Sequence, residues 1–322
     1  MLVDLLDRQL THALYLDARA PFSRLGEVLR VSDQTVARRY RRLQERHGLH
    51  VVGRLDPRWS GRSEWVIRLR CAPGTARTVA DLLARRPDTH WVRIGSGGAE
   101  VIANVASRSD DDRDALLLDK LPSTRSTAVL SAQCVTHVYR GGTTTWRAIT
   151  DALSSGQVRR LTHPAGTPGT AVARPGVEPA DESLLAELGR DGRASHVALA
   201  LATGRDQSTV RRRIAELRAG GALYFDLDLD ADSLGYHLAS LLWVTAEPAR
   251  LDAVGHALAD LGETPFVAAT TGSANLLVSL LSRGPEHLHR QLTTEVGTVR
   301  GVRHVETAPI LRTVKRTARR PG

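Results

Sequence analysis

The sequence is poor in cysteine, in lysine and in long apolar runs. It has 2 cysteines, Cys71 and Cys134, which form no CxxC pair, and this excludes a disulfide framework and a cysteine-based zinc site. No stretch approaches the roughly 20 apolar residues that a membrane-spanning helix needs. The N-terminus has acidic residues early and lacks both the basic region and the small-residue cleavage site of a signal peptide. These absences favour a cytoplasmic protein that does not act in a membrane.

Catalytic signatures are missing as well. The 12 histidines make no HExxH or similar metal spacing, and neither a Gly-x-Ser-x-Gly elbow nor a P-loop occurs. We therefore expect no catalytic residue, no bound metal and no cofactor. What the chain does have is a formal net charge of +9, which favours nucleic acid as a partner. Only Lys120 and Lys315 are lysines, so this charge is almost entirely arginine, a bias that genome composition can also produce. Where the arginines lie is therefore more informative than how many there are.

The chain repeats itself without a gap at a spacing of 174 residues. The matched segments are Arg19-Ala20, Leu25, Thr35-Val36, Arg38-Arg39 and Leu43 with Arg193-Ala194, Leu199, Thr209-Val210, Arg212-Arg213 and Leu217. With one extra residue the register continues, so that Ser96-Gly97 matches Thr271-Gly272. A register of this length predicts an internal duplication.

The repeat divides the chain into five predicted segments. They are a helix-turn-helix domain at 1–56, a ferredoxin-like domain at 57–153, a linker rich in glycine and proline at 154–177, a second helix-turn-helix domain at 178–230 and a second ferredoxin-like domain at 231–322. Trp146, Ile149 and Leu153 lie at helical spacing, which predicts a short capping helix just before the linker.

Three short helices open each copy. Apolar spacing predicts a first helix around Leu6, Leu10 and Leu14, a second at 23–29 and a third running to about residue 45 with Ser32 as its N-cap. The second copy predicts a first helix around Leu184 and Leu188, then helices at 195–202 and 207–219, the last with Asp206 as N-cap. Short strands at 51–55 and 224–229 follow. This is the layout of a winged-helix-type helix-turn-helix.

Positive charge is concentrated on the third helix of each copy. Residues 32–46 and 205–218 each have a formal charge of +3, although residues 177–230 as a whole have −3. Val36, Tyr40 and Leu43 face the core, and we expect the arginines on the opposite face to reach solvent. Arginine neutralises DNA phosphates and reads guanine in the major groove. The predicted DNA-binding residues are Ser32, Gln34, Thr35, Arg38, Arg39, Arg42, Gln207, Ser208, Thr209, Arg211 and Arg212.

The second part of each copy reads strand–helix–strand–strand–helix–strand, the ferredoxin-like βαββαβ order. The expected elements are 64–71, 75–86, 90–94, 99–106, 110–120 and 127–139 in the first copy, and 237–245, 249–261, 265–271, 274–281, 285–296 and 302–315 in the second. The expected fold class is therefore α+β.

Five motifs follow one another in order along the second copy. They are Thr209-Val210 with Arg213 and Leu217, Leu234-Gly235-Tyr236, Thr271-Gly272 with Asn275-Leu276-Leu277, Gly301-Val302 with Val305-Glu306-Thr307, and Val314-Lys315. Together they make the chain similar to the Lrp/AsnC regulators. The resemblance covers residues 179–317 and, in weaker form, 5–140, where the L-G-Y and V-K motifs are missing.

The resemblance implies a DNA-binding transcription regulator that senses a small effector, commonly an amino acid. Effectors of this family bind near the T-G-x-x-D loop, which places candidate contacts at Thr271, Gly272 and Asn275, with Ser96, Gly97 and Glu100 opposite. Both copies depart from the usual aspartate of that loop, which favours an unusual effector or none. The glycines are equally compatible with plain hairpin turns.

The resemblance also implies dimerisation through the α+β domains and further assembly of dimers. Since one chain carries both halves, we expect the two α+β domains to pair as an intrachain pseudo-dimer, and such pseudo-dimers to self-associate. The two recognition helices differ, so we expect double-stranded DNA with an imperfectly palindromic operator as partner. Glu216 should make the second half-site the weaker one.

Two alternatives remain open at the level of sequence. Duplicated chains resembling this family also occur as sirohaem decarboxylases, but the second-strand segments THWVRIGSGGAEV and FVAATTGSANLLV lack a pattern such as Y-x-R-x-H-x-x-N-x-W. The other alternative is an effector-binding protein whose DNA-binding domain is degenerate, as the acidic second module would allow.

Overall fold

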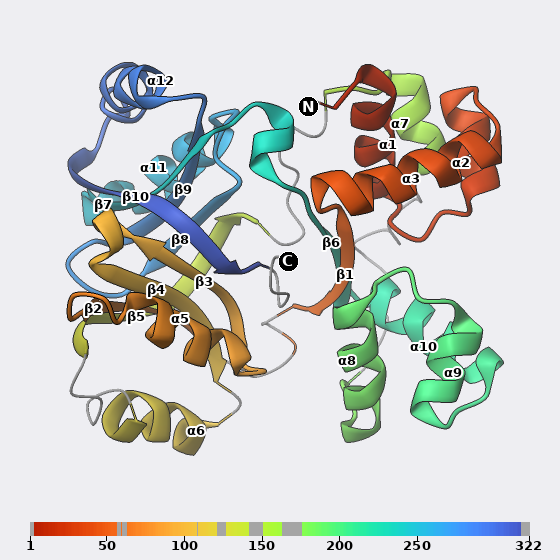
Figure 1. Cartoon of the computed structure of the whole chain (residues 1–322), viewed down its shortest axis with the longest axis horizontal. Helices are drawn as coiled ribbons and strands as arrows, with labels where there is room; N and C mark the ends of the chain where they lie inside the picture. The colour runs from red at the N-terminus through yellow and green to blue at the C-terminus, as the bar shows by residue number, and fades with distance from the viewer. Residues whose placement is uncertain are drawn as a thin grey trace. The chain divides into compact units, whose positions relative to one another are not determined.

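The computed structural model describes residues 3–56, 59, 63–107, 109–120, 127–141, 151–162 and 176–316 (Figure 1). The chain forms two compact units, each assembled from two distant stretches of sequence. The first comprises Met1–Ser60 and Arg147–Leu234, and the second Gly61–Trp146 and Gly235–Gly322. Corresponding parts of the two sequence repeats therefore fold together. In the described ranges, no helix has the length and apolar content needed to cross a membrane.

The first unit contains two three-helix modules, as predicted. Their helices are α1 (Leu5–Leu16), α2 (Phe22–Leu29) and α3 (Asp33–His47) in one, and α8 (Glu182–Arg190), α9 (His196–Thr203) and α10 (Gln207–Ala219) in the other. Ser32 caps α3, because its Oγ accepts a hydrogen bond from the Thr35 N–H at 3.2 Å. Asp206 occupies the N-cap of α10 as expected, but its side chain makes no capping hydrogen bond. Val36, Tyr40 and Leu43 are buried in the first module's core, which confirms the predicted inner face of α3.

The predicted linker begins with a helix, so its first part was assigned wrongly. α7 (Ser155–Leu161) starts at a capping box of Ser154 and Gln157, and Leu161 is fully buried in the core of the first module. The Gln157 Nε2 donates to the Val28 carbonyl at 3.0 Å. Leu153 lies in a bend, not in the predicted capping helix, and Trp146 and Ile149 are outside the described residues.

The predicted wings are also different in the structure. Each module contributes one strand, β1 (His50–Leu55) or β6 (Leu223–Asp228), and the two strands pair antiparallel with each other. A single strand has unpaired N–H and C=O groups along both edges, and here the strand of the other module satisfies one edge. Val52 pairs with Asp226, the residue 174 positions later.

The second unit contains the two ferredoxin-like domains. The first has β2 (Ser63–Cys71), α5 (Ala76–Arg85), β3 (Thr89–Gly95), β4 (Glu100–Ser107), α6 (Asp110–Asp114) continued by the π-helical turn Ala115–Lys120, and β5 (Thr127–Arg140). The second has β7 (Leu238–Ala246), α11 (Leu251–Asp260), β8 (Phe266–Thr270), β9 (Leu276–Ser282), α12 (Pro285–Arg290) continued by the π-helical turn Gln291–Val296, and β10 (Val302–Lys315). The predicted βαββαβ order is confirmed in both.

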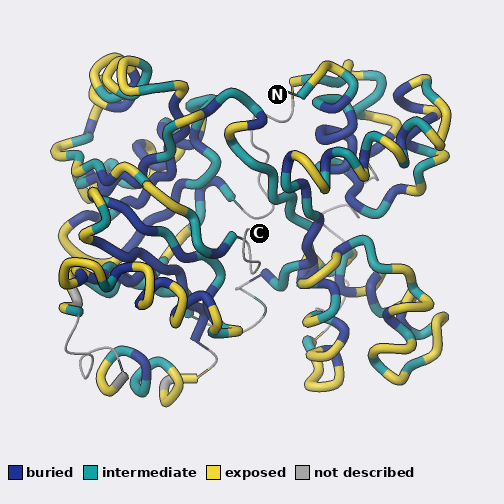
Figure 2. The backbone as a smooth tube through the Cα atoms, in the orientation of Figure 1, coloured by how far each residue is buried: buried dark blue, intermediate teal, exposed yellow. Residues whose placement is uncertain are grey.

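The eight strands close into one barrel in the order β10-β3-β4-β2-β5-β8-β9-β7. Within it each domain keeps its own four strands together, and the last strand of each also pairs with the second strand of the other: Val135 with Thr270, and Ile310 with Gly95. The strand ends then pass beneath the other domain's first helix. Tyr139 packs in the core under α11, and Val314 packs in the core that contains the buried face of α5. Figure 2 shows the strands mostly buried and the outer helix faces exposed.

Candidate nucleic-acid interface and effector loops

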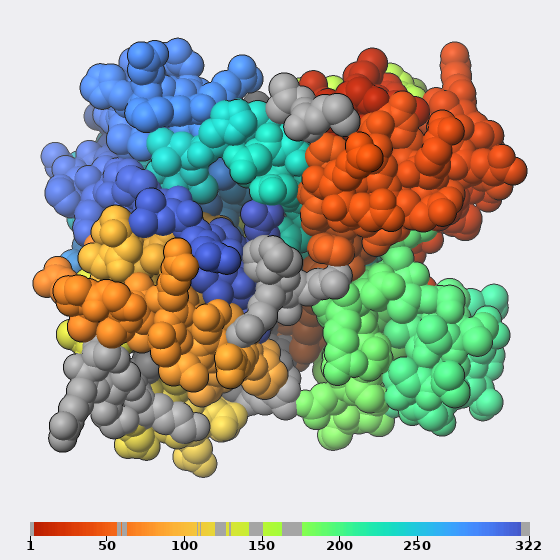
Figure 3. Space-filling model, in the orientation of Figure 1, coloured from red at the N-terminus to blue at the C-terminus, as the bar shows by residue number. Residues whose placement is uncertain are grey.

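The exposed face of α3 is narrower than the arginine content suggests. Gln34, Arg38 and Arg41 are exposed, and Thr35 is half-buried with its Oγ1 2.9 Å from the Ser32 Oγ. These side chains lie between the N-terminus and the middle of α3. The N-terminal residues of a recognition helix are the ones that reach base edges. Figure 3 shows the surface of this module in orange-red and that of the second module in green. Gln34, Arg38 and Arg41 form the exposed basic stripe of α3.

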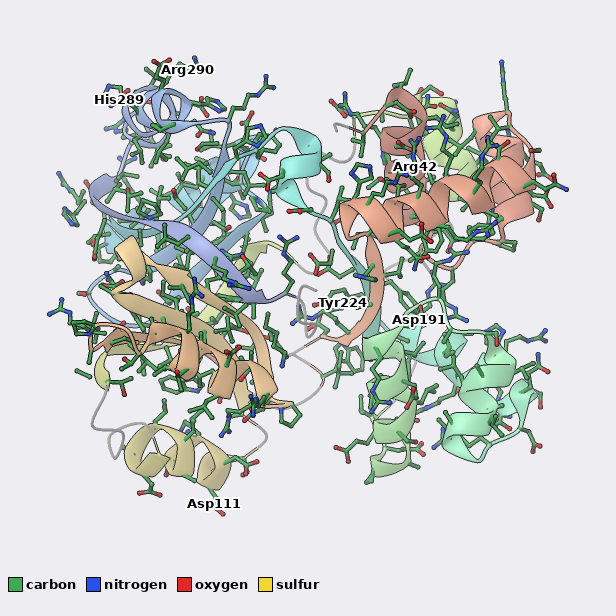
Figure 4. All side chains as sticks on the ribbon, viewed as in Figure 1. Arg42, Asp111, Asp191, Tyr224, His289 and Arg290 are labelled. Atoms are coloured by element: carbon green, nitrogen blue, oxygen red, sulfur yellow. The ribbon has the colours of Figure 1, made fainter. Side chains whose placement is uncertain are left out.

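Arg39 and Arg42 do not lie on that solvent face, so the prediction of their orientation was wrong. Both guanidinium groups turn back to the start of α1, where they donate to the carboxylates of Asp4 and Asp7. Figure 4 labels Arg42 on α3. The Asp7 side chain is fully buried, while those of Arg39 and Arg42 are 23% and 31% exposed. A buried carboxylate needs a charged partner, so these arginines hold α3 against α1.

The second module repeats this ion pair. Arg213 donates to the buried Asp181 at 2.6 Å, and its guanidinium also lies 3.6 Å from Glu178. Asp181 and Glu178 occupy the repeat positions of Asp7 and Asp4. The sequence carried a signal for this pair, since the acids and the arginine recur in one register, but their contact across helices was not predicted.

The predicted DNA-binding residues of α10, by contrast, are exposed or half-buried. Gln207, Ser208, Arg211 and Arg212 are exposed, and Thr209 is half-buried. The Arg212 Nε lies 3.6 Å from the Glu216 carboxylate, one turn further along the helix. Glu216 occupies the repeat position of Arg42, so it lowers the positive charge of this helix face.

Acid should loosen the first module through Asp4. Burial raises the pKa of this carboxyl, but hydrogen bonds from Arg39, from the Asp7 N–H and from Arg42 outweigh it and lower the pKa to about 2. Because the folded-state pKa lies below the ordinary value of 3.8, protonation favours the unfolded chain. The stabilisation is therefore present above pH 4 and is lost as the pH falls towards 2. Circular dichroism between pH 5 and 2 measures this loss, and in an Arg39→Gln variant the Asp4-dependent part should shrink.

The first predicted effector loop is held by a buried ion pair. Glu100 accepts hydrogen bonds from the Arg68 Nε and Nη2 at 2.8 and 2.9 Å, and the Ser96 Oγ donates to it at 3.1 Å. Arg68 also donates to Glu306 at 2.6 Å and lies 4.3 Å from the centre of the Trp243 ring. The carboxylate of Glu100, a predicted effector contact, is thus already bound by Arg68 and Ser96. Gly97 is exposed, and its φ of +69° suits glycine.

The second predicted effector loop is tied to the other domain's last strand. Thr271 exchanges two hydrogen bonds with the Cys134 backbone, both at 2.9 Å. The Asn275 amide is engaged within its own domain, because it accepts from the Ala246 N–H at 2.8 Å and donates to the Ala246 carbonyl at 2.9 Å. Gly272 has a φ of +107° and is exposed. Asn275 and Glu100 therefore shape the loops, and the exposed positions among the predicted contacts are Gly97, Thr271 and Gly272.

Two family matches cover parts of both helical modules and of one ferredoxin-like domain. The AsnC-type helix-turn-helix domain matches residues 3–44 and 180–218, and the Lrp/AsnC ligand binding domain matches residues 240–320. The HTH-type transcriptional regulator FL11 of Pyrococcus horikoshii is 29% identical over 142 residues, which make up 44% of this chain and 93% of that protein. The uncharacterized HTH-type transcriptional regulator PF1231 of Pyrococcus furiosus is 28% identical over 137 residues, 42% of this chain and 92% of that protein.

Solved structures extend the similarity of fold to nearly the whole chain. The siroheme decarboxylase NirDL and its co-complex with an iron-uroporphyrin III analogue align with TM-scores of 0.59 and 0.60. Each alignment covers 98% of this chain and 94% of the other, at 11% identity. This likeness concerns the fold alone.

Proposed function

We propose that this chain, which belongs to the Lrp/AsnC family of DNA-binding transcription regulators, binds an imperfectly palindromic operator as an intrachain pseudo-dimer. The observation that carries the proposal is the pairing of Val52 with Asp226, its equivalent in the repeat. Equivalent residues face each other only on a two-fold axis. A two-fold pair of recognition helices matches the two-fold symmetry of a palindromic DNA site.

An internal duplication explains why one chain has both halves. The helix-turn-helix family matches two segments, and each relative named above accounts for less than half of this chain. The barrel supports the same origin, since Val135 with Thr270 and Ile310 with Gly95 are the same contact exchanged between copies. One chain would then do what two identical subunits do in a homodimer.

The proposed DNA contacts are those predicted side chains that remain accessible, together with Arg41. They are Ser32, Gln34, Thr35, Arg38 and Arg41 on α3 and Gln207, Ser208, Thr209, Arg211 and Arg212 on α10. Glu216 lies beside the arginines of α10, so it repels phosphate and weakens the second half-site. The two half-sites are therefore unequal in sequence and in affinity.

DNase footprinting on DNA upstream of the chain's own gene tests the proposal. We expect two protected segments about one helical turn, or a multiple of it, apart, with the segment contacted by α10 released first as salt rises. A single protected segment would contradict the pseudo-dimer. No protection at any salt concentration would favour a degenerate DNA-binding domain.

We place the effector, in this proposal, at the exposed glycine turns of the two loops, around Ser96-Gly97 and Thr271-Gly272. Gly97, Thr271 and Gly272 are exposed, whereas Glu100 and Asn275 act by holding the loops in shape. A thermal-shift screen of amino acids and related metabolites tests this site. A ligand that raises the melting temperature and changes DNA affinity supports it, and the absence of any stabilising ligand counts against it.

An enzymatic role is not part of this proposal, although one structural neighbour is a siroheme decarboxylase. β3 and β8 lack the tyrosine–arginine–histidine pattern, and His90 at the start of β3 lies 3.4 Å from Glu64. Absorbance titration with sirohaem discriminates the two functions. We expect no shift of the Soret band, and turnover of the added sirohaem would overturn this part of the proposal.

A further inference from the structure

The two helix-turn-helix modules are joined by a reciprocal pair of arginines. The Arg19 guanidinium, in the first module, donates to the carbonyls of Gly192 and Ala194 at 2.6 and 2.8 Å. Arg193, in the second module, donates to the carbonyls of Ala18 and Ala20. Arg19 and Arg193 occupy equivalent positions of the repeat. Each arginine therefore bridges two backbone acceptors of the other module by the same geometry.

Aromatic rings of the other module receive the two guanidinium groups. Arg193 lies 4.8 Å from the ring centre of Phe22 and 5.3 Å from that of Tyr40, and Arg19 lies 5.9 Å from that of Phe225. Tyr40 belongs to α3 and is buried in its core. Arg193 of the second module thus contacts the recognition helix of the first module directly.

The backbone around the arginines is closely packed as well. The Gly192 N–H donates to the Val51 carbonyl of β1 at 2.8 Å. A Cβ on Gly192 would come within 2.9 Å of Val51 and 3.0 Å of Phe225. Asp17 and Asp191 turn the chain before each arginine by accepting from the backbone N–H of Arg19 and Arg193. The close packing of Gly192 against Val51 and Phe225 therefore leaves little room for one module to move relative to the other.

From this geometry we infer that Arg19 and Arg193 are positioning residues that fix the separation and orientation of the two recognition helices. The role differs from the phosphate and base contacts assigned above, since neither arginine belongs to α3 or α10. β1 and β6 pair the modules along one line, and two bidentate arginines stop rotation about that line. The inference rests on the proposed function only for its consequence, which is selection of half-site spacing.

A distance measurement without DNA tests the inference directly. Spin labels at Gln34→Cys and Ser208→Cys, equivalent exposed positions on the two helices, are placed in a background with Cys71→Ala and Cys134→Ala. Pulsed electron paramagnetic resonance should give one narrow distance distribution in this parent. Arg19→Ala with Arg193→Ala should broaden or shift it. The matched control, Arg77→Ala with Arg190→Ala, removes the same charge from exposed positions and should leave it unchanged. A distance distribution that stays unaltered in the variant with Arg19→Ala and Arg193→Ala overturns the inference.

The milder pair Arg19→Lys with Arg193→Lys covers the case in which the alanine variant does not fold. A lysine keeps the charge but cannot bridge two carbonyls with a planar fork, so broadening should persist in a folded protein. On DNA, two correctly spaced half-sites bind on the order of 10²–10⁴-fold more tightly than one. The lysine pair should lose at least about tenfold of that advantage while keeping its affinity for a single half-site.

The two readouts separate failure of the inference from failure of the proposed function. DNA binding is measured on chains without spin labels, because Gln34 and Ser208 are proposed DNA contacts. If the unlabelled chain with its natural residues binds no DNA but the distance distribution broadens in the labelled arginine variants, the proposed function is wrong and the inference stands. If the unlabelled chain binds the operator and the arginine variants keep both the narrow distance and the spacing preference, the inference is wrong and the function stands.

Discussion

Replacing Arg38 and Arg41 together by alanine will weaken operator binding by at least about tenfold and reduce the salt dependence of the affinity by nearly two slope units. Each lost phosphate contact removes about 0.9 from the slope of log K against log salt concentration. An arginine that reads a base contributes about 1–3 kcal/mol. Fluorescence anisotropy between 50 and 200 mM salt gives affinity and slope in one series. The fold should be unaffected, because both side chains are exposed and neither contacts Asp7.

The matched variant on the second helix is Arg211→Ala with Arg212→Ala. In a footprint, each double variant should lose protection over its own half-site, and the α10 variant should lose less affinity because Glu216 already offsets part of that charge. Arg77→Ala with Arg190→Ala serves as the control for total charge. Unchanged affinity and slope in the Arg38/Arg41 variant would mean that the exposed basic stripe is only a solvated surface.

Asp7→Ala will destabilise the unit that contains both helical modules by about 3 kcal/mol. Removing one partner of a buried ion pair leaves the other partner uncompensated, at a cost of about 3–5 kcal/mol. Arg39 and Arg42 keep partial solvent access and a contact with Asp4, which places the loss near the lower end of that range. Urea unfolding followed by circular dichroism measures the change in free energy.

Two comparisons make the Asp7 experiment specific. Asp181→Ala removes the equivalent carboxylate of the second module and should destabilise by a similar amount. Glu45→Ala removes an exposed acid from α3 and should change stability by no more than about 0.5 kcal/mol. If Asp7→Ala behaves like Glu45→Ala, the ion pair contributes nothing to the packing of α1 on α3.

Local spacing predicted the inner face of α3, but it could not predict the direction of Arg39 and Arg42. Val36, Tyr40 and Leu43 recur with the helical period, so their burial follows from one helix alone. An arginine side chain is long enough to bend back to a neighbouring helix, and its choice between water and Asp7 depends on where α1 lies. The repeat register contained both partners, yet a register shows equivalence and not contact.

Strand positions were predicted within a few residues, whereas their partners between copies were not. β1 was expected to belong to a wing, but it pairs with β6, more than 160 residues away. Alternating burial indicates that a segment is a strand without indicating which edge it joins. α7 was missed for a related reason, because its two apolar residues, Val158 and Leu161, are too few to show a helical period. Its place becomes clear only in the fold, where Leu161 packs into the core of the first module.

The shared barrel also has a consequence for synthesis on the ribosome. The first ferredoxin-like domain receives Val314 into its core and a hydrogen bond from the Lys315 Nζ to the Arg86 carbonyl at 2.7 Å, a contact across 229 positions of sequence. The first domain's own sequence ends with β5. One edge of its strand β3 therefore stays unpaired until β10 has been translated. At 5–20 residues per second the delay is roughly 10–35 s. During that time an unpaired strand edge is open to chaperones and to other nascent chains, and a half-domain from a neighbouring chain could close the barrel in place of its own.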